Sequence, residues 1–244
     1  MRCGLLGEKL GHSYSPALHA LFGDYDYELF EVSPDRLGDF LRVRDFQGLN
    51  VTIPYKTTML AICDDLTETA ATIGSVNTVL KQLDGSLLGD NTDAAGFEGM
   101  VWKSRIRILG RKCLVLGSGG ASLSAQYVLR KLGAGEVVVI SRTGENNYDN
   151  LDRHQDAAVI VNATPVGMYP NTAASPVDLR QFPRCEGVLD LIYNPARTRL
   201  LLQAEERGLC RANGLGMLVA QAKAAAERFL DAPIPDGQVE EITA

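Results

Sequence analysis

A short apolar run that ends in a cluster of glycines most constrains how this chain can fold. Lys112–Leu116 (KCLVL) is rich in strand-forming residues, and Gly117–Gly120 follows it directly. Ala121–Leu132 then has helical spacing, and Glu136–Ile140 (EVVVI) is a second apolar run. Continuous apolar strands with helices between them are typical of a parallel sheet that is covered on both faces.

Two further apolar runs, Ala157–Val161 (AAVIV) and Val188–Ile192 (VLDLI), extend this pattern toward the C-terminus. Repeated units of this kind predict a doubly wound, dinucleotide-binding domain. The last predicted helix, Met217–Leu230, is expected to pack back on the first half of the chain.

The first half of the chain also alternates between strands and helices, but it lacks the glycine-rich turn. The predicted strands are Arg2–Leu6, Tyr27–Val32 and Leu49–Ile53. The predicted helical segments are Pro16–Phe22, Pro34–Val43 and a stretch that begins at Leu60–Cys63. A hairpin is expected around Asp84-Gly85, formed by Ser75–Leu80 and Ser86–Asp90. We therefore predict two α/β domains with a cleft between them.

The composition narrows the class of protein. The chain has 244 residues, is 45% hydrophobic and carries a net charge of −6, which indicates an ordinary globular protein and disfavours nucleic acid as a partner. Five dispersed cysteines and three histidines predict reduced thiols and no metal site. Without a leader or a membrane-spanning run, a cytoplasmic protein that does not bind membranes is expected. We expect a monomer or a homodimer.

The glycine cluster has the context of a phosphate-binding turn. Gly117, Ser118, Gly119, Gly120 and Ala121 lie between a predicted strand and a predicted helix. Glycines let the backbone approach a pyrophosphate, and the helix N-terminus faces its charge. The alternative is a tight turn that binds nothing.

The end of the next predicted strand indicates which dinucleotide is bound. An enzyme that uses NAD usually carries a carboxylate there for the ribose hydroxyls, whereas this chain has Ser141, Arg142 and Thr143. An arginine can bind and stack on a 2′-phosphate. The position of Arg142 therefore favours NADP over NAD, although an ordinary surface arginine is the alternative.

Two serines in the first half predict an anion site. Ser13 and Ser15 are two residues apart, and Pro16 suits the first turn of a helix with Ser15 as its N-cap. In an extended segment both hydroxyls would point the same way, which suits a carboxylate. For Ser15 alone, an ordinary cap is the alternative.

Three other polar clusters supply groups for a small hydroxylated carboxylate. They are Asn50–Lys56, Gly74–Thr78 and Gly89–Asp93. Oxidation of an alcohol needs a hydride acceptor and a base, so we predict Lys56 as the base and Asp93 as its partner. Each cluster could singly be a turn, and Lys56 could be an exposed loop lysine.

With these residues in place, the chain resembles the shikimate dehydrogenase family. The resemblance covers nearly the whole chain, with its segments in the family's order. They are GHSYSPALH (11–19), GLNVTIPYK (48–56), IGSVNT (73–78), GDNTDAAGF (89–97), GSGGAS (117–122), SRT (141–143), NATPVGM (162–168), DLIYNPARTRLL (190–201) and GLGMLVAQA (214–222).

The resemblance implies NADP-dependent interconversion of 3-dehydroshikimate and shikimate, a step in aromatic amino-acid (chorismate) biosynthesis. It implies that Lys56 is the catalytic acid and base, that Asp93 is its partner, and that Ser13 and Ser15 hold the substrate carboxylate. The rest of the substrate would be held by Thr52, Asn77, Asp93 and Gln221, with Tyr193 nearby.

The resemblance also implies a set of cofactor-binding residues. Gly117–Ala121 would hold the pyrophosphate, and Ser141, Arg142 and Thr143 lie where the 2′-phosphate would be held. The nicotinamide side would be lined by Asn162, Thr164, Gly167, Met168, Gly214 and Met217. A discontinuous substrate domain, about 1–92 plus 214–244, would accompany a Rossmann domain of 93–213.

The chain departs from the family after Arg142. A second arginine that the family often carries is absent, so NAD remains a weaker expectation beside NADP. Residues 144–161 also leave no room for a full helix–strand–helix, which predicts a Rossmann domain with a trimmed crossover. Two alternatives stay open: a dehydrogenase for quinate or an amino analogue, and a non-catalytic ligand sensor on the same fold.

Overall fold

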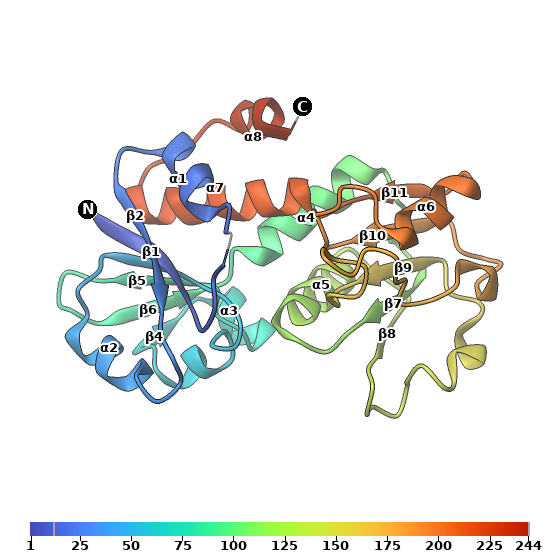
Figure 1. Cartoon of the computed structure of the whole chain (residues 1–244), viewed down its shortest axis with the longest axis horizontal. Helices are drawn as coiled ribbons and strands as arrows, with labels where there is room; N and C mark the ends of the chain where they lie inside the picture. Colours follow the sequence, from blue (N-terminus) through green and yellow to red (C-terminus); the bar gives the residue numbers. More distant parts are fainter. Residues whose placement is uncertain (12, 244) are drawn as a thin grey trace. The chain divides into compact units, whose positions relative to one another are not determined.

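The computed structural model describes residues 1–11 and 13–243, and the chain forms two compact units (Figure 1). The first unit is Met1–Asp93 with Val219–Ala244, and the second is Ala94–Leu218. The predicted boundaries, 1–92 plus 214–244 and 93–213, lie close to these. The assignment of one domain to substrate and the other to cofactor remains a prediction.

The first unit is built on a six-stranded mixed sheet with the order β2-β1-β3-β5-β6-β4. Its strands are β1 (Arg2–Gly7), β2 (Asp26–Glu31), β3 (Gly48–Val51), β4 (Asp65–Leu66), β5 (Thr78–Lys81) and β6 (Leu87–Asp90). β1 is parallel to β2 and β3, whereas β5 is antiparallel to both β3 and β6. The predicted hairpin is therefore present as β5 and β6.

Helices pack on both faces of this sheet. Those of the first unit are α1 (Ser15–Phe22), α2 (Leu37–Val43), α3 (Glu68–Ile73) and α8 (Gly237–Thr243), with the 3-10 turn η1 (Thr58–Ala61). The larger core cluster joins the side chains of α2, η1 and α3 to Leu6, Leu49 and Val79 of the sheet. The predicted helical stretch at Leu60–Cys63 is this 3-10 turn rather than an α-helix.

The last long helix, α7 (Leu215–Leu230), begins in the second unit and ends in the first. Its C-terminal half contributes Ala225 and Phe229 to a cluster with Cys3, Tyr25 and Tyr27. The predicted packing of this helix on the first domain is thereby confirmed for its C-terminal half.

The second unit contains a five-stranded parallel sheet with the order β11-β10-β9-β7-β8. Its strands are β7 (Lys112–Leu116), β8 (Glu136–Ile140), β9 (Val159–Asn162), β10 (Gly187–Asp190) and β11 (Cys210–Ala212). Its helices are α4 (Asp93–Ser104), α5 (Gly120–Lys131) and α6 (Arg199–Glu206), with the 3-10 turns η2 (Leu151–His154) and η3 (Leu179–Gln181).

The connection from β8 to β9 is short, as predicted. Among its residues, all of which the structure describes, only η2 is helical, and β9 pairs directly with β7. The predicted Rossmann-like domain with a trimmed crossover is confirmed.

None of the helices in the described part of the chain has both the length and the apolar character that crossing a bilayer requires.

Candidate active site

The first candidate site lies at the carboxyl end of β3. After this strand, Tyr55 is buried and donates its hydroxyl to the carbonyl of Val32, which anchors the loop. The carbonyl of the next residue, Lys56, accepts a hydrogen bond from the N–H of Val76 at 2.9 Å. These two hydrogen bonds fix the backbone around Lys56.

The Lys56 side chain ends on a carboxylate. Its Nζ lies 2.5 Å from Oδ2 of Asp93, the first residue of α4, and the two side chains are 18% and 8% exposed. The structure therefore brings together Lys56, the predicted acid and base, and Asp93, its predicted partner. An ammonium group held by a buried carboxylate is oriented and can still deliver a proton outward.

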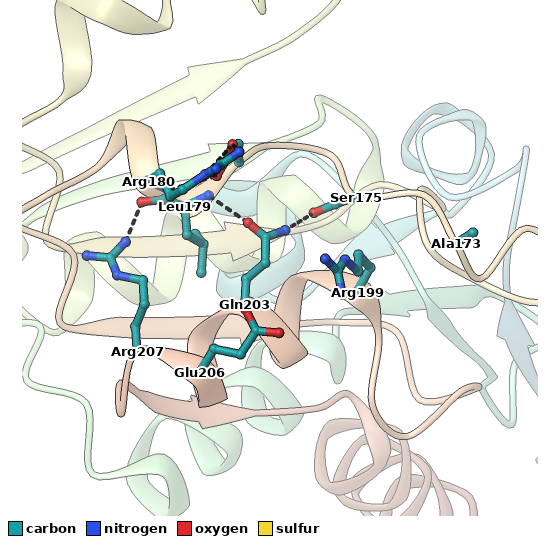
Figure 2. Close-up of a pocket in the computed structure, with 9 residues that line it drawn as sticks. Ala173, Ser175, Leu179, Arg180, Arg199, Gln203, Glu206 and Arg207 are labelled. Carbon is teal, nitrogen blue, oxygen red and sulfur yellow. Dashed lines mark hydrogen bonds and ion pairs between the residues drawn. The ribbon is translucent and has the colours of Figure 1, made fainter.

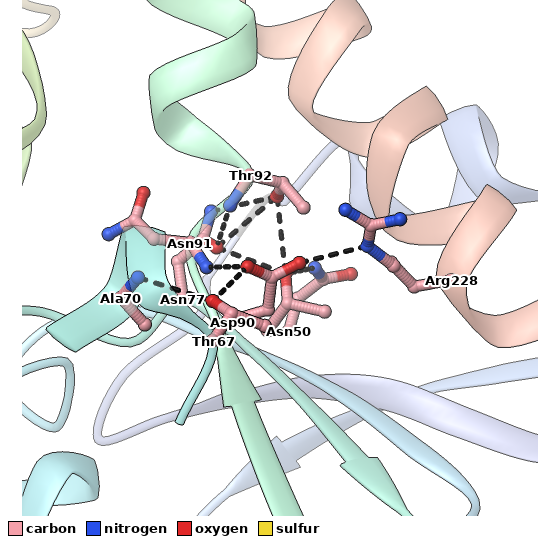
Figure 3. A network of polar contacts seen from close by, with 9 residues as sticks. Asn50, Thr67, Ala70, Asn77, Asp90, Asn91, Thr92 and Arg228 are labelled. Atoms are coloured by element: carbon pink, nitrogen blue, oxygen red, sulfur yellow. Dashed lines mark hydrogen bonds and ion pairs between the residues drawn. The ribbon is translucent and has the colours of Figure 1, made fainter. Parts of the chain in front are cut away.

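A buried amide, that of Asn77, holds the residue that precedes Asp93. Asn77 accepts a hydrogen bond from the backbone N–H of Thr92 at 2.7 Å and donates to the Thr92 hydroxyl at 3.1 Å. The neighbouring Thr78 donates to the same Asn77 oxygen and accepts from Asn50 (Figure 3). The segment that leads into Asp93 is thus held by side chains at the start of β5, which are in turn held by Asn50 of β3.

An ion pair fixes the strand that precedes this segment. Asp90, the last residue of β6, accepts from Thr67, from the N–H of Asn91 and from Nε of Arg228 on α7 (Figure 3). Burial raises the pKa of this carboxyl, but these hydrogen bonds outweigh burial and leave the pKa below its ordinary value. Asp90 lies in the predicted polar cluster Gly89–Asp93, but its pairing with Arg228 was not predicted, because no local pattern connects residues so far apart in sequence.

The two predicted carboxylate-binding serines are also brought together. The hydroxyl of Ser13 donates to that of Ser15 at 3.2 Å, and it accepts from the Ser15 N–H at 3.2 Å. The predicted backbone conformation of these two serines was wrong. Ser15 is the first helical residue and not the N-cap, which is Tyr14 in an αR conformation without a side-chain cap. The segment is therefore turned rather than extended.

The other predicted substrate residues come from both units. Thr52 and Gln221 are half-buried in the first unit, at the end of β3 and on α7. Tyr193 belongs to the second unit and is also half-buried.

The second candidate site is the turn between β7 and α5. Gly117 has a φ of +104°, and a Cβ there would lie 3.0 Å from the Ala163 carbonyl oxygen, so a glycine is required. Gly119 is the N-cap of α5 and provides no side-chain cap, and Ser118 and Gly119 are exposed. The first N–H groups of this helix are thus available to an anion.

The predicted 2′-phosphate residues lie beside this turn. β7 and β8 pair with Leu116 opposite Ile140, and the N–H of Gly117 donates to the Ile140 carbonyl at 2.8 Å. Arg142 and Thr143 follow directly and are exposed. Backbone donors and a guanidinium at neighbouring strand ends suit the phosphates of a dinucleotide.

Residues predicted on the nicotinamide side have a clear structural role as well. Asn162 accepts from the N–H and hydroxyl of Thr164 and donates to the carbonyl of Val166, which shapes the loop after β9. Gly167 has a φ of +98°, and a Cβ on Gly214 would collide with the Leu191 carbonyl. Met168 is exposed, and Met217 is buried.

Asp190 is a residue of this region that sequence reasoning missed. It is fully buried at the end of β10 and accepts from Asn162, the Thr198 hydroxyl and the Ile192 N–H. Burial dominates and raises the pKa of its carboxyl above the ordinary value. The available signal was a single acidic residue inside the otherwise apolar run Val188–Ile192.

A separate hollow of about 530 Å³ in the second unit contains none of the predicted site residues (Figure 2). Two of its arginines already have partners in the protein. Arg180 is paired with Asp178, and Arg207 donates to the carbonyls of Leu179 and Phe182.

Comparison with known proteins identifies the family. Residues 5–79 match the family model described as the shikimate dehydrogenase substrate binding domain. The chain is 35% identical to a shikimate dehydrogenase (NADP(+)) of Clostridium perfringens, over 98% of this chain and 96% of the relative. The chain belongs to the shikimate dehydrogenase family. The family predicted from the sequence is confirmed.

Solved structures in and near the shikimate dehydrogenase family share the whole fold. The Thermus thermophilus shikimate 5-dehydrogenase in complex with NADP(H) and shikimate is 36% identical, with a TM-score of 0.87 over 98% of this chain and 97% of that one. A quinate dehydrogenase of Corynebacterium glutamicum in complex with NAD has the same TM-score at 25% identity, over 99% and 97%. The fold alone therefore does not separate the two activities, but the sequence is closer to the first.

Proposed function

We propose that this protein is an NADP-dependent shikimate dehydrogenase that reversibly reduces 3-dehydroshikimate to shikimate in aromatic amino-acid (chorismate) biosynthesis. The observation that carries the proposal is the Lys56–Asp93 pair at 2.5 Å in a chain of this family. The relatives named as NADP(+)-dependent shikimate dehydrogenases, and the structure solved with NADP(H) and shikimate, support the substrate and the cofactor.

In this proposal, Lys56 moves the proton. In the reducing direction its ammonium group donates a proton to the substrate carbonyl oxygen, and in the oxidising direction the amine takes the proton of the hydroxyl. Asp93 accepts the Lys56 hydrogen bond and so holds the ammonium group in place. A charge-assisted hydrogen bond of this kind orients the proton that is to be transferred.

The substrate would be oriented by polar groups of the first unit and Tyr193. Ser13 and Ser15 are 3.2 Å apart and both can donate to one carboxylate. We propose that Thr52, Asn77, Asp93 and Gln221 hold the hydroxyls and the ring edge, with Tyr193 nearby. Asn77 is already fixed by Thr92, so it needs little reorganisation on binding.

The residues of the second unit fit an NADP molecule. Gly117–Ala121 present uncapped backbone N–H groups for the pyrophosphate, and Arg142 and Thr143 beside Ser141 suit the 2′-phosphate. Asn162, Thr164, Gly167, Met168, Gly214 and Met217 are proposed for the nicotinamide side. When bound, the nicotinamide supplies or accepts the hydride of the reaction.

Initial rates test the proposal directly. Shikimate and quinate are each assayed with NADP and with NAD at saturating concentrations. We expect the highest kcat/KM for shikimate with NADP and a weaker rate with NAD. A quinate rate well above the shikimate rate would make the protein a quinate dehydrogenase, like the Corynebacterium enzyme that shares its fold. Tight shikimate binding without turnover would instead make it a ligand sensor.

We further propose that the protein works in the cytoplasm as a monomer or a homodimer. All five cysteines are free in the described structure, and three of them are buried. Free thiols at this number suit a reducing compartment. Size-exclusion chromatography with light scattering would distinguish the monomer from the dimer.

A further inference from the structure

The loop that follows β8 carries Arg142 and is closed on itself by a backbone hydrogen bond. The N–H of Ser141 donates to the carbonyl of Asn146 at 3.1 Å. This bond closes residues 141–146 into one turn, and Arg142 and Thr143 lie inside it. The direction in which these two residues leave the sheet therefore depends on how firmly Asn146 is held.

The side chain of Asn146 is held by a buried histidine. Nε2 of His154, the last residue of η2, lies 3.0 Å from Oδ1 of Asn146. His154 is buried, and burial together with the nearby charge of Lys112 lowers the pKa of its imidazole, so the ring is neutral at neutral pH and carries one hydrogen. Because an amide oxygen can only accept, that hydrogen lies on Nε2. Within the described residues, Nδ1 has no hydrogen-bond partner.

A second side chain of η2 holds the loop on either side of Asn146. Asn150, the N-cap of η2, donates from its side chain to the carbonyl of Glu145 at 2.8 Å and accepts from the N–H of Asn147 at 2.9 Å. The turn η2 is itself fixed, because Leu151 is buried in the core cluster of the second unit. In this trimmed crossover, η2 thus ties the loop to the domain core.

This anchoring matters because the Arg142 side chain is not fixed by a partner of its own. It is exposed, and it makes no hydrogen bond or ion pair with the residues that the structure describes. The place of its guanidinium is therefore set by the backbone of residues 141–143. A group that is already in place when its ligand arrives binds more tightly than one that must first be ordered.

We propose that His154 and Asn146 are positioning residues for the 2′-phosphate of NADP, which they influence through the backbone that carries Arg142. This inference rests on the proposed function, in which Arg142 binds that phosphate. Neither residue needs to touch the cofactor. Their effect should therefore be confined to the dinucleotide that carries the 2′-phosphate.

The first test compares His154→Leu with His154→Gln. Leucine keeps an apolar side chain in the buried space but has no donor, whereas glutamine can offer an amide N–H to Asn146. We expect His154→Leu to raise the KM for NADP about fivefold, as the loss of one hydrogen bond implies. The KM for NAD and both kcat values should change less than twofold. His154→Gln should stay within twofold of wild type, and so should Arg153→Gln, an exposed neighbour on η2.

A second set of variants separates positioning from general loosening of the domain. Asn146→Ala removes the acceptor of the same hydrogen bond, so it should raise the KM for NADP by the same factor and add nothing to His154→Leu. It also gives the test if His154→Leu does not fold. In an Arg142→Gln background, either substitution should change the KM for NADP less than twofold, because the guanidinium through which it acts is gone.

Four results would overturn the proposal. They are an unchanged KM for NADP in Asn146→Ala, an equal rise for NAD, a further fivefold rise in the Arg142→Gln background, and a His154→Gln variant as impaired as His154→Leu.

The wild-type protein keeps this inference apart from the proposed function. If wild type turns over shikimate but the variants keep its KM for NADP, only the positioning role fails. If wild type does not turn over shikimate, the proposed function fails, and the ratio of the Kd values for NADP and NAD, measured by calorimetry in the same variants, tests the positioning role instead. If wild type binds neither dinucleotide, both proposals fall.

Discussion

The two candidate sites of this protein are built in opposite ways. In the first unit, Asn50, Asn77 and Asp93 are buried side chains that are already hydrogen-bonded to one another or to their neighbours. In the second unit, the turn around Gly119 and the following Arg142 are exposed, and the helix after the turn has no side-chain cap.

This difference indicates how each site would recognise its ligand. A site made of prearranged buried side chains distinguishes ligands by their shape and by the position of each hydroxyl. Such a site needs little rearrangement when the ligand binds. A site made of backbone N–H groups and an exposed guanidinium recognises negative charge, so it binds any phosphate at that position. Substrate identity should therefore depend on many residues at once, and cofactor identity on few.

The largest effect should follow the loss of Lys56. Lys56→Ala removes the group that moves the proton, so kcat should fall about 1,000-fold, a typical loss for a general acid or base. Shikimate should still bind, since the serine pair and Asn77 are untouched, and calorimetry measures this. Lys103→Ala, an exposed lysine of α4, serves as the control. A loss of less than tenfold would remove Lys56 from the chemistry.

Cofactor choice should rest largely on one side chain. Arg142→Gln should raise the KM for NADP about 30-fold, because a hydrogen bond between charged groups contributes roughly 2 kcal/mol. The KM for NAD, which has no 2′-phosphate, should change less than twofold. Arg153→Gln alters another exposed arginine nearby in sequence and should change neither. An equal change for both cofactors would show that Arg142 does not read the 2′-phosphate.

The buried character of the first unit should appear as acid sensitivity. Burial lowers the pKa of His19 to about 3 from an ordinary value of 6.5, although a hydrogen bond with Asn50 opposes the shift. The unfolded chain takes up this proton below pH 6.5 but the folded chain does so only near pH 3, so stability falls as the pH drops between these values. At pH 5 the loss is about 2 kcal/mol.

Urea unfolding at pH 7.5 and pH 5 measures this loss. In His19→Gln, the difference in unfolding free energy between the two pH values should be smaller by about 2 kcal/mol than in wild type. Tyr25→Phe removes the partner of His19 but keeps the imidazole, so it should retain the full difference. An unchanged difference in His19→Gln would mean that His19 is not held neutral.

The smallest effect should come from the ion pair beside the first site. Arg228→Gln should lower the unfolding free energy by about 1 kcal/mol, because the Arg228 side chain is 58% exposed and partly screened. Asp90 would keep its bonds from Thr67 and Asn91. Arg130→Gln, on the exposed side of α5, is the control. A loss above about 3 kcal/mol would place this pair among the buried charges.

The sequence predicted those features that depend on local pattern. The strands and the glycine turn at Gly117–Gly120 follow from apolar runs and small residues, and the trimmed crossover follows from the length of residues 144–161. The Lys56–Asp93 pair was predicted from chemistry and family resemblance. These features need no knowledge of which distant residues meet.

The features that were missed depend on contacts over long distances in the sequence. Arg228 reaches Asp90 across 138 positions, and Tyr27 reaches Asn50 across 23. A tyrosine in a strand or an arginine on a helix has no local signal that names its partner. The serine pair shows the intermediate case, because its proximity was predicted whereas its turned backbone was not.

The short connection between β8 and β9 has a consequence for the aggregation of this protein. Because no further strand follows in this connection, β8 is the outermost strand of its sheet, next to β7 alone. Its sequence, EVVVI, is rich in valine. An apolar strand at a sheet edge is a template for a second chain. The shorter domain therefore leaves an apolar edge strand at which a second chain could pair and aggregation could begin.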